Sequence, residues 1–187
     1  MAEPKSYERW REELNRFLTS GEKLLVISYD GPDLNPRRFW HRLIKRNPFR
    51  FLLQITVVSL TTYMPAGEFK NSLLRLIGMN IGRDTFIASG VMFDVEFPTL
   101  ITIGPGAIIG TMTKILTHEV TIRSIRVGRI EIGKQAVVGV GCVLRSGVRI
   151  GDGAVVSMQS FVHKDVEAGV FAGGKPAEMI KKLDGLV

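Results

Sequence analysis

Residues 132 to 162 read IGKQAV VGVGCV LRSGVR IGDGAV VSMQSF V, and this stretch repeats with a period of six. An aliphatic residue opens each block, and in most blocks a small residue such as Gly133 or Gly139 follows it. A repeat at a fixed period indicates that each block is one structural unit, which buries its apolar side chain by stacking on its neighbours. The aliphatic positions are Ile132, Val138, Leu144, Ile150, Val156 and Val162.

A period of six fits neither a single helix, whose apolar face recurs every 3.6 residues, nor a single strand, whose period is two. It fits a coil with flat sides, in which each block forms one short strand and one turn. Three blocks then make one triangular turn of a β-helix with a narrow aliphatic core. The small residue after each aliphatic one lies near a corner, where a larger side chain would clash. Ordinary β-hairpins would need alternating polar residues and irregular turns, so we disfavour them.

The length of 187 residues predicts one main domain with an appendage. Hydrophobic residues make up 45% of the chain, which is enough for a buried core. The only cysteine, Cys142, excludes an intrachain disulfide and a cysteine-rich metal site, and its small-residue position favours a core filler. A formal net charge of +7 suits an anionic small molecule, an anionic membrane surface or nucleic acid. Because no nucleic-acid-binding motif is present, we expect an anionic small molecule first and a membrane surface second.

The chain carries no apolar signal-peptide core near its N-terminus, and no apolar run reaches the length of a membrane span. We therefore expect a cytoplasmic protein.

The N-terminal part predicts helices. Residues 5–20 place apolar side chains on one helical face, residues 28–36 form a turn-rich connector, and residues 69–77 form a last short helix. Between them, the basic stretch 37–50 runs into the apolar stretch 51–60. This segment either lies on anionic lipid or covers the open end of the β-helix with its charges in water, and we favour the second interpretation.

The coils begin at Ile81, and their register slips twice, over residues 94–102 and 116–131. A slip indicates extra residues at a corner, and functional residues tend to lie on such loops. After Val162 the pattern dissolves over residues 168–176, and a short basic helix is expected over 177–183. The predicted divisions are an N-terminal helical cap over 1–78, a β-helix over 79–167 with a loop at 116–131, and a C-terminal tail over 168–187.

His118 is the main catalytic candidate because it lies at the mouth of the second slip beside an acid. Histidine is the usual general base near neutral pH, and a second group commonly orients it. Glu119 is adjacent in sequence, whereas Asp94 lies in the first slip and can approach when coils stack. Either acid can fix the imidazole tautomer, and the sequence leaves both open.

A metal site is not predicted. A three-histidine site needs clustered ligands, but His41 lies outside the repeat and His163 reads as a surface residue. Lys164 and Lys175 lie where the coils end and can meet phosphates, although solvated surface lysines explain them equally well.

Residues 75 to 180 resemble the left-handed β-helix acyltransferases, also called hexapeptide-repeat transferases. The order of a histidine-containing loop, closing coils and a Gly-Lys-Pro-Ala tail is similar to that of maltose and galactoside O-acetyltransferases and their polysaccharide-modifying relatives. The motifs that carry the resemblance are DVEFP (94–98), ITIG (101–104), ILTHE (115–119), IG (132–133), IGDGAV (150–155), VHKDV (162–166) and GGKPA (173–177).

The resemblance implies a homotrimeric acetyltransferase whose active sites lie between neighbouring β-helices. Acetyl-coenzyme A (acetyl-CoA) is then the donor, and a sugar or glycan-precursor hydroxyl is the acceptor. His118 takes the hydroxyl proton, and the oxygen attacks the thioester directly without an acyl-enzyme. The implied donor contacts are Gly141, Ser160, Lys164 and Lys175.

Three positions depart from the family pattern: Ser146 replaces a usual proline, Gln159 a usual glycine and Glu178 a usual lysine. Two alternatives to the transferase remain, one suggested by these departures and the segment 37–60 and one by the repeat itself, which specifies only the fold. The first is a non-catalytic or membrane-docking β-helix assembly, and the second is a γ-type carbonic anhydrase, which needs three histidine ligands.

Overall fold

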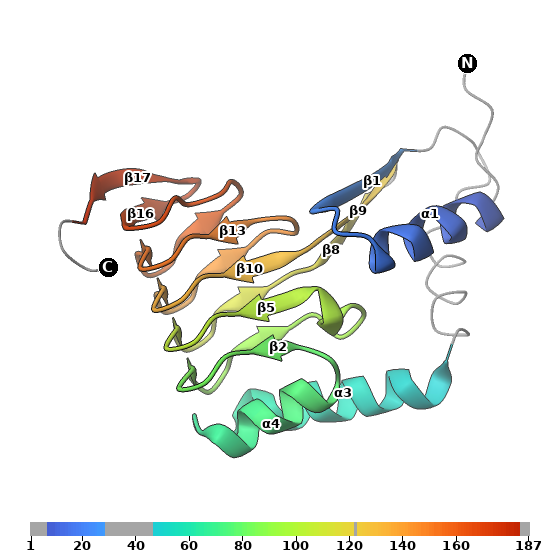
Figure 1. Cartoon of the computed structure of the whole chain (residues 1–187), viewed down its shortest axis with the longest axis horizontal. Helices are drawn as coiled ribbons and strands as arrows, with labels where there is room; N and C mark the ends of the chain where they lie inside the picture. The colour runs from blue at the N-terminus through green and yellow to red at the C-terminus, as the bar shows by residue number, and fades with distance from the viewer. Residues whose placement is uncertain (1–6, 29–46, 122, 184–187) are drawn as a thin grey trace.

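The computed structural model describes residues 7–28, 47–121 and 123–183, and much of this chain winds into a stack of short strands, here called the coil stack (Figure 1). Three sheets form its sides, and successive strands of the coils join different sheets, whereas the last strand of the chain folds back on the strand before it. Within each sheet the coil strands pair in parallel, with Ile101 opposite Ile130 and Ile109 opposite Val138. One strand per block and three blocks per coil, as the period of six predicts, are confirmed.

The strands are short because each occupies only part of a six-residue block. The first side consists of β2 (Asn80–Ile81), β5 (Ile101–Ile103), β10 (Ile130–Ile132) and β13 (Arg149–Ile150). The second consists of β3 (Phe86–Ile87), β6 (Ile108–Ile109), β11 (Val137–Val138), β14 (Val155–Val156), β16 (Val170–Gly174) and β17 (Ala177–Lys182). The third consists of β4 (Met92–Phe93), β7 (Lys114–Ile115), β12 (Val143–Leu144) and β15 (Phe161–Val162).

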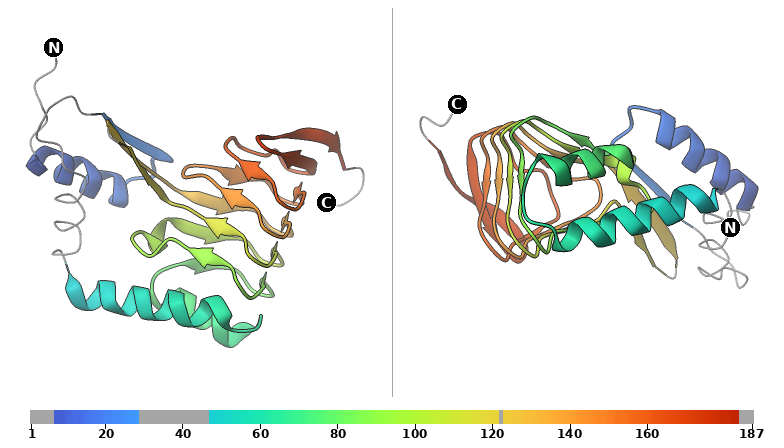
Figure 2. Two further views of the ribbon diagram at one scale, coloured as in Figure 1. Left: turned by 180° about the vertical axis from the view of Figure 1, so that it is seen from behind. Right: turned by 90° about the horizontal axis from the view of Figure 1, so that it is seen from below.

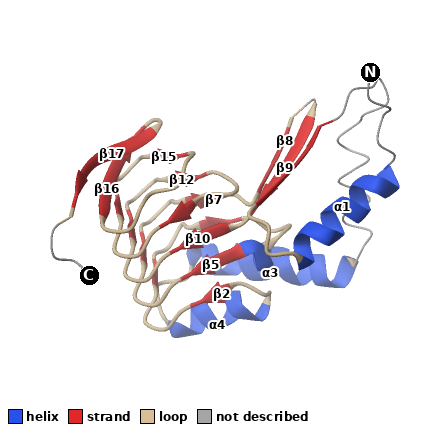
Figure 3. Cartoon of the chain, turned by 45° about the horizontal axis from the view of Figure 1, so that its top comes forward, coloured by secondary structure: helices blue, strands red, loops and turns tan. Residues whose placement is uncertain are grey.

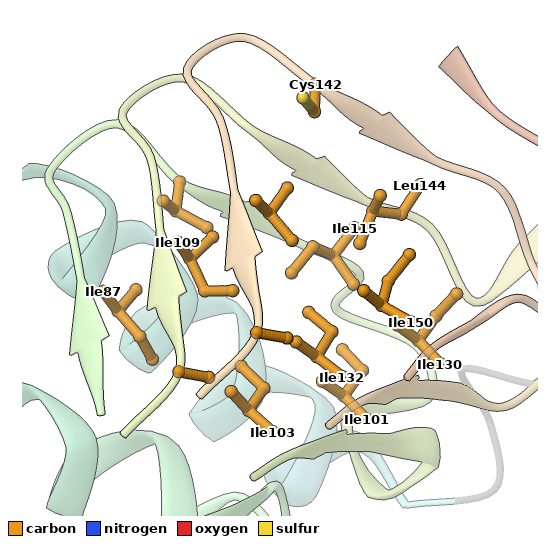
Figure 4. Close-up of a cluster of buried hydrophobic side chains, with 14 of the residues drawn as sticks. Ile87, Ile101, Ile103, Ile109, Ile115, Ile130, Ile132, Cys142, Leu144 and Ile150 are labelled. Atoms are coloured by element: carbon orange, nitrogen blue, oxygen red, sulfur yellow. The ribbon is translucent and has the colours of Figure 1, made fainter. Parts of the chain in front are cut away.

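The core is the column of aliphatic side chains inside the coils (Figure 4). All six aliphatic positions of the repeat are at most 2% exposed, which confirms their predicted inward direction. Cys142 is buried in the same column as a free thiol. The corners are equally tight, since a Cβ atom on Gly133 would lie 2.6 Å from the backbone nitrogen of Asp152, in the next coil.

Two helices, α3 (Pro48–Tyr63) and α4 (Glu68–Leu76), lie across the end of the stack where the coils begin (Figure 2). Val57, Val58 and Leu74 extend the aliphatic core beyond the first coil. A stack end without cover would expose a row of unpaired backbone groups. The interpretation of this segment as a cover is therefore confirmed for residues 48–60, whereas residues 37–46 lie outside the described part of the chain.

A fourth sheet stands beside the stack and projects from it (Figure 3). Its strands β1 (Leu24–Ser28), β9 (Ser124–Gly128) and β8 (His118–Val120) pair antiparallel in that order. The helix α1 (Tyr7–Thr19), predicted over 5–20, packs Trp10 and Phe17 against this side sheet in a separate small core. The expected loop over 116–131 is thus a hairpin, because the alternating residues Ser124–Val127 bury Ile125 and Val127 between polar neighbours.

The C-terminal prediction was wrong in two respects. Residues 177–182 form the strand β17 and not a helix, since they pair antiparallel with β16 and cover the last edge of the second side. The coil pattern also continues beyond residue 167, because β16 pairs in parallel with β14 through Val155 and Phe171. The repeat is hidden there because this coil is shorter: Val155 lies opposite Phe171, 16 residues on, whereas Val137 lies opposite Val155, 18 residues on.

Candidate functional site

The two register slips meet at one corner of the coil stack. Asp94 follows β4 directly, and His118 opens β8 just after β7. Because β4 pairs with β7 through Phe93 and Ile115, the ends of these strands lie side by side on successive coils. The structure therefore brings Asp94 and His118 together, as stacking of the coils allowed.

The Asp94 carboxylate holds the histidine by both its ring and its backbone. Its Oδ2 atom lies 2.5 Å from Nδ1 of His118 and accepts hydrogen bonds from the backbone N–H groups of Thr117 (3.0 Å) and His118 (3.1 Å). Its Oδ1 atom accepts from the N–H of Glu96 at 2.9 Å. A carboxylate on Nδ1 fixes which ring nitrogen carries the proton, so Nε2 is left as the basic atom.

The contact between Asp94 and His118 is largely shielded from water, which strengthens the electrostatic attraction between the two groups. The Asp94 side chain is 2% exposed and that of His118 is 19% exposed. Burial raises the pKa of Asp94, but hydrogen bonds from His118 and Thr117 outweigh burial and hold the pKa below its usual value. The acid is therefore a carboxylate at neutral pH, and it favours any positive charge that forms on the imidazole.

Two further residues of the first slip adjoin the pair. Phe97 packs edge-on against the His118 ring, with ring centroids 5.9 Å apart. Burial raises the pKa of the Glu96 carboxyl to about 7, while His118 lowers it and Asp94 raises it further. Neither residue was singled out from the sequence, although both lie in the DVEFP motif and Phe97 is a large apolar residue on a polar slip.

Glu119 lies on the other face of β8 from His118, because successive side chains of a strand point to opposite sides. Its carboxylate accepts hydrogen bonds from Nε of Arg145 at 2.9 Å and from Oγ of Ser146 at 2.7 Å. Arg126 adds three hydrogen bonds to Ser146 from the neighbouring strand β9. Of the two acids left open by the sequence, Asp94 holds the histidine, and Glu119 ties the hairpin to the coil stack.

The predicted donor contacts lie on later coils. Gly141 adopts a φ of +69° at a corner, and the buried Ser160 donates its hydroxyl to the Ser157 carbonyl while accepting the N–H of Gly174. The exposed Lys164 pairs with Glu178 at 3.4 Å. Lys175 is exposed in the turn between β16 and β17. None of these four residues contacts the Asp94–His118 pair through a hydrogen bond in the described structure.

Within residues 7–28, 47–121 and 123–183, no group of three or more histidine, cysteine, aspartate or glutamate side chains can hold a metal ion. His163 stacks on Phe161 with ring centroids 6.0 Å apart. His41 lies outside the described residues. Among the helices in the described ranges, none combines the length and apolarity that crossing a membrane requires.

The sequence matches no protein-family model. It is 40% identical over 143 residues to the Bacillus subtilis protein named "Putative acetyltransferase YvoF", an alignment that covers 75% of this chain and 83% of the relative. The fold is similar to a Vibrio cholerae hexapeptide-repeat acetyltransferase complexed with acetyl-CoA, at 20% identity and a TM-score of 0.64, covering 92% of this chain and 99% of that one.

A galactoside acetyltransferase complexed with coenzyme A is similar at 20% identity and a TM-score of 0.60, covering 73% of this chain and 82% of that one. The period-six coils, the paired histidine at their slip and the identity to the Bacillus subtilis relative agree with one another. This chain belongs to the hexapeptide-repeat acetyltransferase family.

Proposed function

We propose that this protein transfers an acetyl group from acetyl-CoA to a hydroxyl group of a sugar or glycan precursor, with His118 as the general base. The observation that carries the proposal is the buried Asp94 carboxylate on Nδ1 of His118, at 2.5 Å. An imidazole held in this way is a competent base for a hydroxyl proton. Family membership and the acetyl-CoA complex of the similar Vibrio cholerae structure support the donor.

The proposed reaction is a direct attack. Nε2 of His118 takes the hydroxyl proton as the acceptor oxygen bonds to the thioester carbonyl carbon. The carbonyl oxygen becomes an oxyanion, which backbone N–H groups stabilise. The carbon–sulfur bond then breaks, and the imidazolium returns its proton to the thiolate of coenzyme A. Asp94 stabilises the imidazolium, and no acyl-enzyme forms.

Donor binding is proposed at the corners of the later coils. Gly141 and Ser160 lie near the pantetheine arm, and Lys164 and Lys175 bind phosphates. Lys164 is paired with Glu178 at 3.4 Å in an exposed ion pair, and such pairs contribute at most about 1 kcal/mol. A phosphate can therefore replace Glu178 as its partner at small cost.

We further infer a homotrimer of left-handed β-helices with sites between the chains. An exposed apolar row along one corner, made of Met112, Val140 and Met158, supports an interface there. Completion of the site by a neighbouring chain would also explain why the four donor residues lie apart from His118. Sedimentation that gave single chains at micromolar concentration would contradict this assembly.

A second candidate is peripheral membrane docking from the cytoplasmic side through residues 37–60. The observation that favours it is the exposed apolar face of α3, with Phe49, Leu52 and Leu60. Adsorption of such a face to anionic vesicles should fall steeply with salt, because basic residues contribute to it. Equal recovery in the supernatant with and without vesicles at low salt would exclude this candidate.

Calorimetric titration with acetyl-CoA tests the donor without knowledge of the acceptor. We expect saturable binding near one site per chain. A K164E variant should bind more weakly, because it would place a negative charge where we propose a phosphate, and an E167Q variant on an exposed loop serves as the control. No heat of binding at millimolar acetyl-CoA would contradict the proposed function.

A further inference from the structure

A pocket of about 510 Å³ lies beside the Asp94–His118 pair, where the end of α1, the first turns of α3 and the first slip meet. Its lining includes Phe51 and Gln54 from α3 and Glu96 and Phe97 from the slip. Phe97 is also the residue that packs against the His118 ring. One side chain therefore forms part of the pocket wall and touches the proposed base.

Gln54 is the unusual member of the buried face of α3. The other buried residues of this helix are Val57, Val58 and Thr61, and the Thr61 hydroxyl is satisfied by the Val57 carbonyl at 2.8 Å. Gln54 is 6% exposed, yet its side-chain amide has no hydrogen-bond partner in the described ranges 7–28, 47–121 and 123–183. Because Gln54 lines the pocket, its amide remains available to hydrogen-bond a molecule bound there.

Glu96 presents a second polar group to the same pocket. Its backbone N–H binds Asp94, which fixes its position, while no donor from the described residues binds its carboxyl. Phe51 and Phe97 supply apolar surface beside these two polar groups. Ligand sites commonly combine mostly apolar walls with a few placed polar groups in this way.

We propose that this pocket is the acceptor subsite and that it holds a sugar ring through hydrogen bonds from its hydroxyl groups to Gln54 and Glu96. The amide can both donate and accept, and the carboxyl accepts from hydroxyl groups. The phenylalanine rings pack against the C–H face of the sugar. Gln54 and Glu96 are thus specificity-determining residues, and a sugar seated here presents its reacting hydroxyl past Phe97 to His118. This inference rests on the proposed function and deepens it.

Direct binding of sugar probes tests the subsite. Wild-type protein is titrated with methyl glucoside, methyl galactoside, methyl mannoside and methyl 2-deoxyglucoside, and binding is followed by ligand-observed NMR without acetyl-CoA. We expect at least one probe to bind, and Q54L and E96Q to weaken that probe about tenfold or more through the loss of a buried hydrogen bond. The exposed variant E167Q should bind as wild type does.

Thermal unfolding of the same variants separates loss of the subsite from loss of the fold. Q54L removes an amide that makes no hydrogen bond within the described residues, so its midpoint should stay close to that of wild type, and E96Q provides an independent second test. Failure of all four probes to bind, or unchanged binding in both variants, would overturn the subsite. Acetyl-CoA titration of wild type and both variants should show unchanged donor binding. Sugar binding without donor binding in wild type would instead overturn the proposed transfer.

Discussion

At the residue scale, the carboxylate of Asp94 organises the site because one oxygen serves three donors. It binds the His118 ring and the N–H groups of Thr117 and His118, so the position and the tautomer of the imidazole are set together. Two of the residues that depart from the family pattern make hydrogen bonds with side chains of this protein. Ser146 donates to Glu119, and Glu178 accepts from Lys164.

Glu96 predicts a pH dependence of stability. Burial raises its pKa from 4.5 to about 7, so the folded state binds the proton more tightly than the unfolded state does. This contribution to stability is complete below pH 4.5 and is lost as the pH rises through 7. Because the side chain is only partly buried, we expect E96Q to exceed wild type by about 1 kcal/mol at pH 8 and to match it at pH 4.5.

Urea unfolding of wild type and E96Q at both pH values measures this difference. Asp94 and His118 adjoin Glu96 in both proteins, so their contributions largely cancel in the comparison. A difference in unfolding free energy that stays constant between pH 4.5 and pH 8 would show that Glu96 is not the group responsible.

At the scale of elements, α4 closes the first coil with polar side chains as well as apolar ones. Nζ of Lys70 donates to the Ala88 carbonyl at 2.8 Å, Nδ2 of Asn71 to the Thr85 carbonyl at 2.8 Å, and Nε of Arg75 to the Ile81 carbonyl at 2.8 Å. These carbonyls lie on the outermost coil, where no further strand can pair with them. Buried backbone groups are almost always satisfied, and here a helix satisfies them.

Lys70 is 1% exposed, and burial lowers its pKa to about 8, so it remains mostly charged at pH 7. K70M should leave the Ala88 carbonyl buried without a partner and lower the free energy of unfolding by about 1–3 kcal/mol. Chemical unfolding at pH 7 measures the change, with K134M as the exposed control. A K70M protein as stable as wild type would mean that the cap depends on apolar contacts alone.

The sequence predicted some of these elements correctly and missed others. The period of six predicted the coil strands because every inward aliphatic is fixed by stacking, as at Val138 and Ile150. The strand at 24–28 was missed because its partner strand lies about a hundred residues away, with Leu24 opposite Gly128. The hairpin at 118–128 pairs locally, with His118 opposite Val127, and it was missed because the whole slip was interpreted as a loop. Residues 177–182 form a strand only because β16 offers an edge, which local composition does not reveal.

At the scale of the whole molecule, two separate hydrophobic cores stabilise different parts of the fold. The aliphatic column holds the coil stack, and the smaller core of Trp10, Phe17 and Ile125 holds α1 against the side sheet. Asp94 and His118 lie where the two parts join. His118 was predicted from its place at a slip, but the choice of Asp94 over Glu119 needed the register of β4 on β7. Gln54 was not predictable, because only packing shows that this polar residue is buried.

His118, held by Asp94, is the proposed base for acetyl transfer. The most direct test is the rate of coenzyme A thiol release from acetyl-CoA with the methyl glycosides as acceptors, in wild type, H118A, D94N and the control H163A. We predict a loss of about a hundredfold or more in H118A and at least about tenfold in D94N, with H163A close to wild type. An H118A protein that releases thiol at the wild-type rate would contradict the account.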